Sequence, residues 1–220
     1  MLQEATLKFL KDLKKNNDKS WFEKNKKRYV SAKEDFENTI TQILMGFNKI
    51  DKSISSLNAK NCIFRIYRDV RFAKDKSPYK TNMGAFMNIG GKKVNTAGFY
   101  FHCEPGQSFI AGGMYMPMPP ELNKIRQEID YNFDEWEKII SHKNFNKYFA
   151  NGVEGIESLS RPPKGYDDSN PAIEFLKMKS FIVTHKLMDK DLQSKELVNK
   201  ILEIYKNMVP FINFLNRAIE

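Results

Sequence analysis

Residues 63–80 contain the densest group of side chains that could bind or polarise a ligand. The segment reads IFRIYRDVRFAKDKSPYK and carries three arginines, three lysines, two tyrosines and two aspartates. Guanidinium groups match phosphate and carboxylate oxygens bidentately, and tyrosine rings can stack on a base or a sugar. Because only Asp69 and Asp75 lie among these cations to reduce their mutual repulsion, we expect the segment to attract an anion.

Residues 63–72 alternate between hydrophobic and charged side chains, a pattern that is typical of a β-strand. On such a strand Arg68 shares the largely apolar face, where a guanidinium group needs a partner. We therefore expect Arg68 to be largely buried, against either a carboxylate on a facing helix or a bound anion. Asp69, which lies between Arg68 and Arg71, is expected to form a salt bridge that orients a guanidinium group.

Aromatic residues outside the segment add possible stacking surfaces. Trp21, Asn25 and Tyr29 recur every four residues and share one face of a predicted helix. We expect this face to pack beside residues 65–80, with Trp21 on a pocket wall. An ordinary place in the core or on a solvated basic surface is the alternative for these side chains. The candidate ligand-binding residues are Arg65, Arg68, Arg71, Lys76, Tyr79, Lys80, Trp21 and Tyr100.

The common local motifs of catalysis are absent from the sequence. It contains no Gly-rich phosphate loop, no dinucleotide-binding glycine pattern and no Gly-x-Ser-x-Gly turn. His102, His142 and His185 lie in three separate segments, and none has a metal-ligand spacing to another His, Cys or Asp. We therefore expect no metal site, and the sequence assigns neither a catalytic residue nor a cofactor.

Helical spacing of apolar residues predicts the helices that must position the segment. The predicted ranges are 3–16, 20–47, 120–141, 144–149, 171–177 and a long helix from about residue 194. Pro210 is expected to kink or break the last helix, because proline has no backbone N–H to donate.

Period-two patterns and turn residues predict the strands. The predicted ranges are 83–89, 94–103, 108–115 and 180–185. The residues 90–93 (GGKK) signal a hairpin turn, and Gly112 with Gly113 indicates a bulge or a close backbone approach.

The order of the predicted elements favours an α+β fold over alternating βαβ units. N-terminal helices precede a central, mostly antiparallel meander sheet, and long C-terminal helices follow it. No composition shift marks a linker, so we expect residues 1–220 to form a single domain.

Composition and charge restrict the class of protein. The chain of 220 residues has a net charge of +9, and its first 80 residues hold 19 Lys and Arg against 10 Asp and Glu. No run approaches the ~20 apolar residues of a membrane span, and no segment resembles a signal peptide. Cys62 and Cys103 are too few for a disulfide scaffold. We expect a cytoplasmic protein without a membrane partner, and the oligomeric state stays open.

The runs RIYRDVRF (65–72) and DKSPYK (75–80) resemble the signature of the domain-of-unknown-function 2461 family, a microbial family of about this length. Further matching positions are Asn17, Trp21, Phe22, Tyr29, Tyr100, Gly112, Gly113, Pro117, Leu122, Ile125, Arg126, 163–166, Leu176, Lys177 and 179–181. Ala73 and Met116 depart from the pattern, where a small polar residue and an aromatic residue are expected. The resemblance covers nearly the whole chain and implies a single domain, but it implies no activity, substrate or cofactor.

Three functions remain in order of preference. The first is binding of a small anionic or phosphate-bearing ligand through residues 65–80. The alternative is an enzyme that acts on a phosphorylated or nucleotide-like substrate at the same site. It would use Arg68 and Lys76 to stabilise charge and Tyr79 or His102 to transfer a proton. The third is nucleic-acid binding, which the basic first part permits but no known module signature supports.

Overall fold

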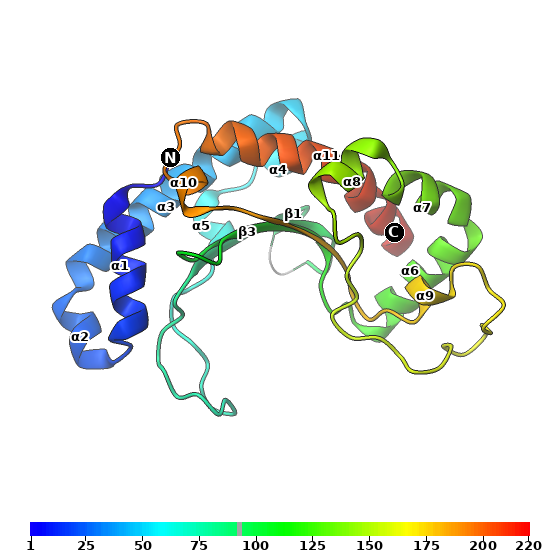
Figure 1. Ribbon diagram of the computed structural model, residues 1–220, viewed down its shortest axis with the longest axis horizontal. Coiled ribbons are helices and arrows are strands. Elements are labelled where there is room, and N and C mark those ends of the chain that lie inside the picture. The colour runs from blue at the N-terminus through cyan, green and yellow to red at the C-terminus, as the bar shows by residue number, and fades with distance from the viewer. Residues whose placement is uncertain (92–93) are drawn as a thin grey trace. The chain divides into compact units, whose positions relative to one another are not determined.

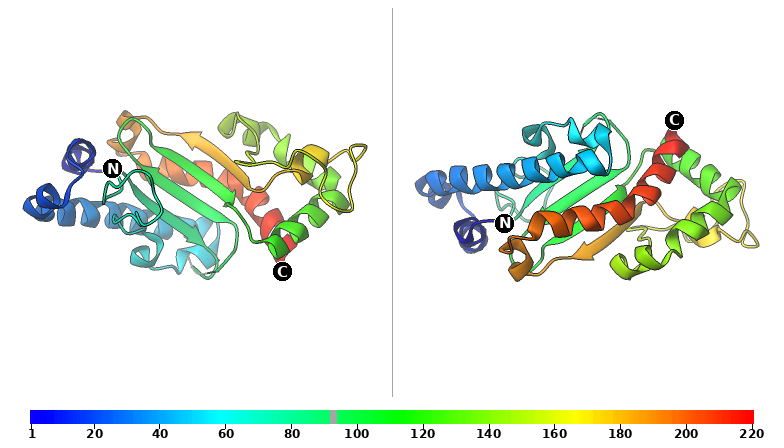
Figure 2. Two further views of the ribbon diagram at one scale, coloured as in Figure 1. Left: turned by 90° about the horizontal axis from the view of Figure 1, so that it is seen from below. Right: turned by 90° about the horizontal axis from the view of Figure 1, so that it is seen from above.

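The computed structural model describes residues 1–91 and 94–220 (Figure 1). A four-stranded antiparallel sheet has the order β1-β2-β3-β4, and Figure 2 shows its strands side by side. The strands are β1 (Met83–Asn88), β2 (Gly98–Cys103), β3 (Phe109–Met114) and β4 (Phe181–Lys186). Helices precede and follow the meander of the first three strands, so the predicted α+β class is confirmed.

The N-terminal helices are α1 (Glu4–Lys15), α2 (Lys19–Lys24) and α3 (Lys26–Gly46). The predicted helix over 20–47 is divided at Asn25, whose backbone leaves helical geometry. Asp18 caps α2 by accepting a hydrogen bond from the Trp21 backbone N–H at 2.9 Å. Three short helices follow that the periodicity did not predict, η1 (Phe47–Lys49), α4 (Lys52–Ser55) and α5 (Ala59–Cys62).

The predicted strand over 63–72 is wrong, because this segment forms only isolated bridges, Ile63 with Ala85 and Tyr67 with Tyr79. The chain pairs with itself there: the Lys80 backbone N–H donates to the Ile66 carbonyl at 2.7 Å. Beyond Arg68 the aspartate side chains compete for the backbone donors. Asp69 accepts from the Arg71 N–H at 3.3 Å. Such local bonds close turns and end a ladder.

The meander strands agree with the predicted ranges to within a few residues. The hairpin turn predicted at 90–93 includes Lys92 and Lys93, which lie outside the described residues. Gly113 confirms the predicted close backbone approach. Its φ is +124°, and a Cβ atom there would lie 2.0 Å from the Phe181 carbonyl oxygen.

The later helices are α6 (Pro119–Tyr131), α7 (Phe133–Ile140), α8 (Lys143–Tyr148), α9 (Ile173–Leu176), α10 (Asp189–Leu192) and α11 (Leu197–Ile219). The predicted helix over 120–141 is divided at Asn132. The predicted break at Pro210 is wrong, because α11 continues through it. Because Pro210 has no backbone N–H, the carbonyl of Lys206 one turn earlier lacks its helical hydrogen bond. Lys206 lies at the surface, where water can replace that bond.

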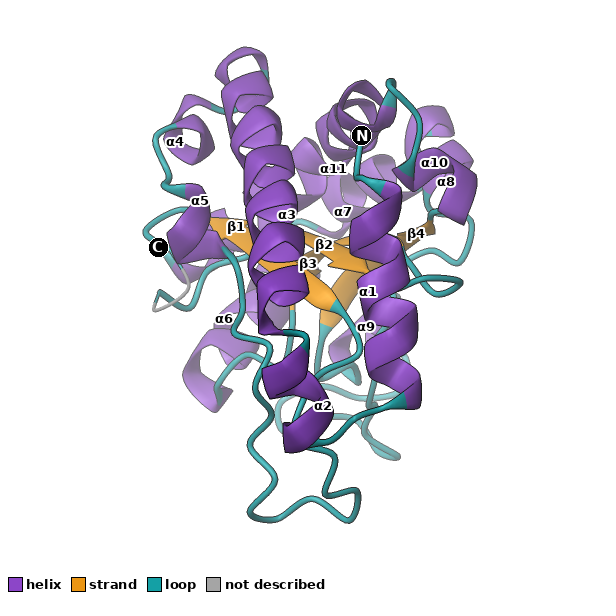
Figure 3. Ribbon diagram, turned by 90° about the vertical axis from the view of Figure 1, so that its left-hand side faces the viewer, coloured by secondary structure: helices purple, strands orange, loops and turns teal. Residues whose placement is uncertain are grey.

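The chain divides into two compact units. The first comprises residues 1–87, 100–110 and 186–203, and the second comprises residues 88–99, 111–185 and 204–220. In the first unit α3 lies over its part of β2 (Figure 3), where the rings of Phe36 and Phe101 are 5.6 Å apart. In the second unit the buried Trp136 of α7 packs against α11. A single domain over 1–220 stays a prediction.

Two further observations concern the helices and the cysteines. Among the described residues, no helix combines the length and the apolar character required to cross a membrane. Neither Cys62 nor Cys103 forms a disulfide among the described residues, and both are buried in the first unit. Burial raises the pKa of the Cys103 thiol well above its ordinary value.

Candidate functional site

The first unit contains a cavity of about 250 Å³ beside α3 and the start of the segment that follows α5. Its polar side chains are those of Lys33, Lys60, Arg65, Tyr29, Tyr67 and Asn82. Apolar side chains that include Phe36 and Ile66 complete the wall, and none of the lining residues carries a carboxylate. The lining therefore carries three cations and no acid.

The cations of this cavity have few partners of their own. Lys33 and Arg65 form no side-chain hydrogen bond or ion pair with any residue that the structure describes. Lys60 lies 3.8 Å from Glu37, and its side chain is 72% exposed. Glu37 belongs to an adjoining hollow of about 320 Å³ that shares Lys33 and Lys60 with the cavity. Glu37 therefore offsets part of the positive charge of the cavity from outside it.

The phenols of the cavity can donate hydrogen bonds. Burial, with a further contribution from Tyr67, raises the pKa of Tyr29 above its ordinary value, so this phenol keeps its proton at neutral pH. Phe22 of α2 lies against Tyr29 at 5.1 Å and stacks on Tyr79 at 3.9 Å, which fixes the loop relative to α3. Tyr79 is buried and belongs to this aromatic support.

The charged side chains of residues 68–77 mostly pair with one another. Arg68 forms an ion pair with Asp75 and donates to the Ser77 carbonyl at 3.2 Å. Its expected contact with a carboxylate is confirmed, but the carboxylate lies in the same loop and not on a facing helix. The Arg68 side chain is 27% exposed, so it is half-buried and not largely buried. Hydrogen bonds from Ser77, and then from Arg68, hold the pKa of Asp75 well below its usual range.

Arg71, Lys76 and Lys80 also have partners within the segment. Asp69 and Arg71 form the expected salt bridge at 2.7 Å. Lys76 donates to the Val70 carbonyl at 3.0 Å, and the Lys80 ammonium group lies 5.3 Å from the Phe64 ring centre. Ligand binding by Arg68, Arg71, Lys76 and Lys80 stays a prediction. Arg65 is the predicted ligand-binding residue that lines the cavity.

The predicted face of Trp21, Asn25 and Tyr29 is interrupted by the helix break at Asn25. Tyr29 lines the cavity together with Tyr67, so this part of the face lies beside the segment as expected. Trp21 does not line the cavity and instead stacks on Phe9 with 6.1 Å between the ring centres. Its neighbour Phe22 makes the aromatic contacts with the loop.

A chain of polar side chains runs along one face of β2. The Tyr100 hydroxyl lies 3.1 Å from His102 Nδ1, and His102 Nε2 lies 3.3 Å from Glu104 Oε2. Residues two positions apart on a strand share a face. The two-residue spacing of Tyr100, His102 and Glu104 is therefore the feature of the sequence that could have indicated this row of polar side chains. Glu104 also accepts hydrogen bonds from Lys14 and Thr81, each at 3.0 Å. The Nε2–H tautomer of His102 satisfies these partners, with Nδ1 as the acceptor.

Asn82 connects this chain to the cavity. It lines the cavity, and its Nδ2 lies 3.3 Å from His102 Nδ1. Burial raises the pKa of Tyr100 to about 12, so the phenol stays protonated. Burial lowers the pKa of His102, and Glu104 only partly opposes that shift. A neutral imidazole with a fixed tautomer can accept or relay a proton.

We expect native His102 to titrate below the ordinary value of about 6.5. The unfolded chain then binds more protons than the folded protein near pH 6. The free energy of unfolding should therefore fall as the pH drops from about 6.5 towards the folded-state pKa. The pH dependence of the NMR signals of the His102 ring gives the midpoint of its titration, with the urea-unfolded protein as the reference. Glu104→Gln should lower the midpoint further, and a native midpoint at or above the unfolded one would contradict the expected effect of burial.

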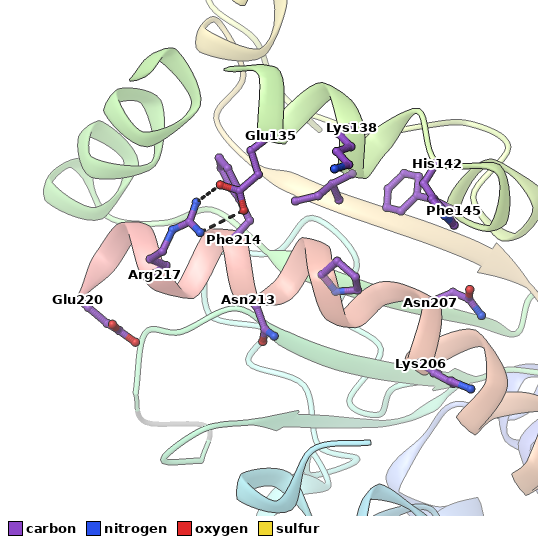
Figure 4. A pocket seen from close by; sticks show the side chains of 12 residues that line it. Glu135, Lys138, His142, Phe145, Lys206, Asn207, Asn213, Phe214, Arg217 and Glu220 are labelled. Atoms are coloured by element: carbon purple, nitrogen blue, oxygen red, sulfur yellow. Dashed lines mark hydrogen bonds and ion pairs between the residues drawn. The ribbon is translucent and has the colours of Figure 1, made fainter. Parts of the chain in front are cut away.

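The second unit contains a larger cavity of about 720 Å³ between α7 and α11 (Figure 4). Arg217 on its wall is held by Glu135 and by Glu128, each at 2.7 Å. Lys138, Lys206, Glu135 and Glu220 also line it, so the cavity carries charges of both signs. This mixture defines no ligand class. In the described part of the chain, no group of three His, Cys, Asp or Glu side chains is arranged to hold a metal ion.

Comparison with known proteins gives one match. The model of a family described as "Conserved hypothetical protein (DUF2461)" matches residues 5–214. No curated protein and no solved structure matches the chain.

Proposed function

We propose that this chain, which belongs to the DUF2461 family, binds a small anionic ligand that carries a phosphate group. The family match confirms the resemblance of the motifs at 65–72 and 75–80, but the family description names no activity. The observation that carries the proposal is the cavity lined by Lys33, Lys60 and Arg65 without a carboxylate.

The side chains of the cavity are chemically suited to a phosphate group. Arg65 can donate two parallel hydrogen bonds to phosphate oxygens, while Lys33 and Lys60 act as point charges. The Tyr29 and Tyr67 hydroxyls and the Asn82 amide can supply further donors. The volume of about 250 Å³ lies just below the ~300–1,000 Å³ of drug-sized ligand sites. The cavity therefore favours a small phosphorylated compound.

An enzyme that acts on such a ligand is the second candidate. The observation that favours it is the position of Asn82, which lines the cavity and also contacts His102. A ligand held by Arg65 would thus lie one side chain away from a neutral imidazole. Nucleic-acid binding has less support, because Arg68, Arg71 and Lys76 pair with carboxylates and carbonyls of their own loop.

We expect inorganic phosphate or small phosphorylated compounds to raise the melting temperature of the protein. At one hundred times the dissociation constant the stabilisation is about 2.7 kcal/mol, which thermal denaturation detects readily. Arg65→Ala should remove most of this shift, because it deletes the bidentate donor. Chloride at matched ionic strength controls for general screening.

Lys74→Ala is the matched control variant. Lys74 is an exposed cation of the same segment and does not line the cavity. This variant should keep the phosphate-induced shift. The proposal is wrong if phosphates, nucleotides and dicarboxylates shift the melting temperature no more than chloride does, or if Lys74→Ala and Arg65→Ala reduce the shift equally.

A further inference from the structure

Arg126 of α6 is a buried cation that forms no ion pair with the residues the structure describes. The residue is only 6% exposed. Its Nη2 donates to the Met178 carbonyl at 3.2 Å, but its buried Nε has no hydrogen-bond partner within residues 1–91 and 94–220. Among the described residues, no carboxylate lies within 4.0 Å of the guanidinium group. Burial lowers the pKa of Arg126, with only Tyr166 opposing the shift. Such a group is costly unless a partner compensates it.

Several arginines of the protein pair with carboxylates although they are far more exposed than Arg126. Arg217, in the same unit, is 48% exposed and is held by Glu128 and Glu135. In the first unit Arg28 pairs with Asp12 at 2.6 Å. Arg126 is buried, so it needs a counter-charge more than these residues do, yet the hydrogen bond described for it is to a carbonyl.

Strained backbone lies next to the carbonyl partner of Arg126. Met116 and Ile156, with φ values of +47° and +53°, are the non-glycine residues with positive φ in the described chain. Ile156 lies between two bridges, Glu154 with Ile182 and Ser158 with Met178. The Met116 N–H donates to the buried Ser180 Oγ at 3.0 Å, two residues after Met178. Non-glycine residues in this region are uncommon, and such strain concentrates at ligand-binding sites.

A phenol lies within electrostatic range of Arg126. Tyr166 and Arg126 each affect the ionisation of the other. Burial, and then Asp130 and Tyr131, raise the pKa of Tyr166, so its hydroxyl keeps its proton. Arg161 and Lys164 precede Tyr166 in the sequence and Asp167 and Asp168 follow it, so residues 161–168 add no net charge. Figure 1 shows these residues as part of the long yellow loop that precedes α9.

We propose that Arg126 is the centre of an anion-binding site in the second unit, which takes a small carboxylate or phosphate. The anion supplies the negative charge that the protein leaves out, and the free Nε with its neighbouring Nη group can hold two of its oxygens. This site does not depend on the cavity of the first unit, because all of its residues lie in the second unit.

The test separates the two sites by working in the Arg65→Ala protein. Isothermal titration with inorganic phosphate and with malonate measures binding at the remaining site. We expect one equivalent of one of these anions to bind per chain, and the preferred anion distinguishes a phosphate ligand from a carboxylate ligand. Adding Arg126→Met should abolish that binding, and adding Arg126→Lys should weaken it at least tenfold because lysine has no bidentate donor. Lys143→Met, which removes an exposed cation of the same unit, should leave binding unchanged.

The melting temperature of the anion-free protein gives a second measurement. Arg126→Met removes an uncompensated buried charge, so this variant should melt at the same temperature as the parent or above it. A variant that melts lower by several degrees would mean that Arg126 has a structural role. Binding of neither anion to the Arg65→Ala protein, or equal binding with and without Arg126, would overturn the proposal. Both results are independent of whether the cavity of the first unit binds phosphate.

Discussion

Gly113→Ala is expected to lower the free energy of unfolding by about 2–6 kcal/mol. The methyl group would lie 2.0 Å from the Phe181 carbonyl oxygen, so the backbones of β3 and β4 would have to separate. Such overpacking costs roughly 1–3 kcal/mol. The φ of +124° adds strain of roughly 1–3 kcal/mol, because alanine rarely adopts this conformation.

Urea denaturation of the purified variant measures this loss. Gly152→Ala is the matched control, because Gly152 lies in the same unit with a φ of +68° and its added Cβ would have no neighbour within 4 Å. The control should lose only about 1–2 kcal/mol, the cost of left-handed backbone in an L-residue. Equal losses in the two variants would mean that the approach of β4 to Gly113 contributes nothing.

Trp136→Ala is expected to cost about 3–5 kcal/mol, the usual range for deleting a large aromatic side chain from a core. The Trp136 side chain is fully buried in the second unit. The rings of Phe175, Phe181, Phe211 and Phe214 surround it at centre distances between 5.1 and 6.2 Å. Because these rings come from three elements, α9, β4 and α11, they cannot all move inward to fill the space left by the indole.

Trp136→Phe separates packing from hydrogen bonding. The indole Nε1 has no hydrogen-bond partner among the described residues, so phenylalanine loses no bond and leaves a smaller void. Thermal and urea denaturation should show a clearly smaller loss for phenylalanine than for alanine. If the two variants were destabilised equally, the contribution of Trp136 would not come from filling the core.

The elements that sequence periodicity predicted well are those with local signals. The meander strands alternate in hydrophobicity and are separated by turn residues, so their ranges agree with the structure to within a few residues. Residues 63–72 alternate in the same way but form no strand. Their alternation comes partly from Arg65 and Arg68, and the side chains of Asp69 and Asp75 satisfy nearby donors that a ladder would need.

The candidate sites were only partly predictable, for the same reason. Arg65 lies in the dense basic segment that the sequence singles out, whereas Lys33 and Lys60 lie on helices and resemble ordinary solvated lysines. The spacing of four residues between Tyr29 and Lys33 was the signal available for that part of the cavity. The burial of Arg126 depends on segments more than thirty residues away, such as Met178 and Tyr166, so no local pattern reveals it.

The two buried cysteine thiols allow the opening of the first unit to be measured chemically. Cys62 and Cys103 are 2% and 0% exposed, and the second unit has no cysteine. Both thiols are shielded from an alkylating reagent, and burial also raises the pKa of Cys103, so modification requires an opening of the first unit. The alkylation rate under native conditions therefore measures the transient opening of the first unit alone. A comparison of this alkylation rate with the rate of global unfolding distinguishes partial opening of the first unit from unfolding of the whole protein, and it needs no introduced label.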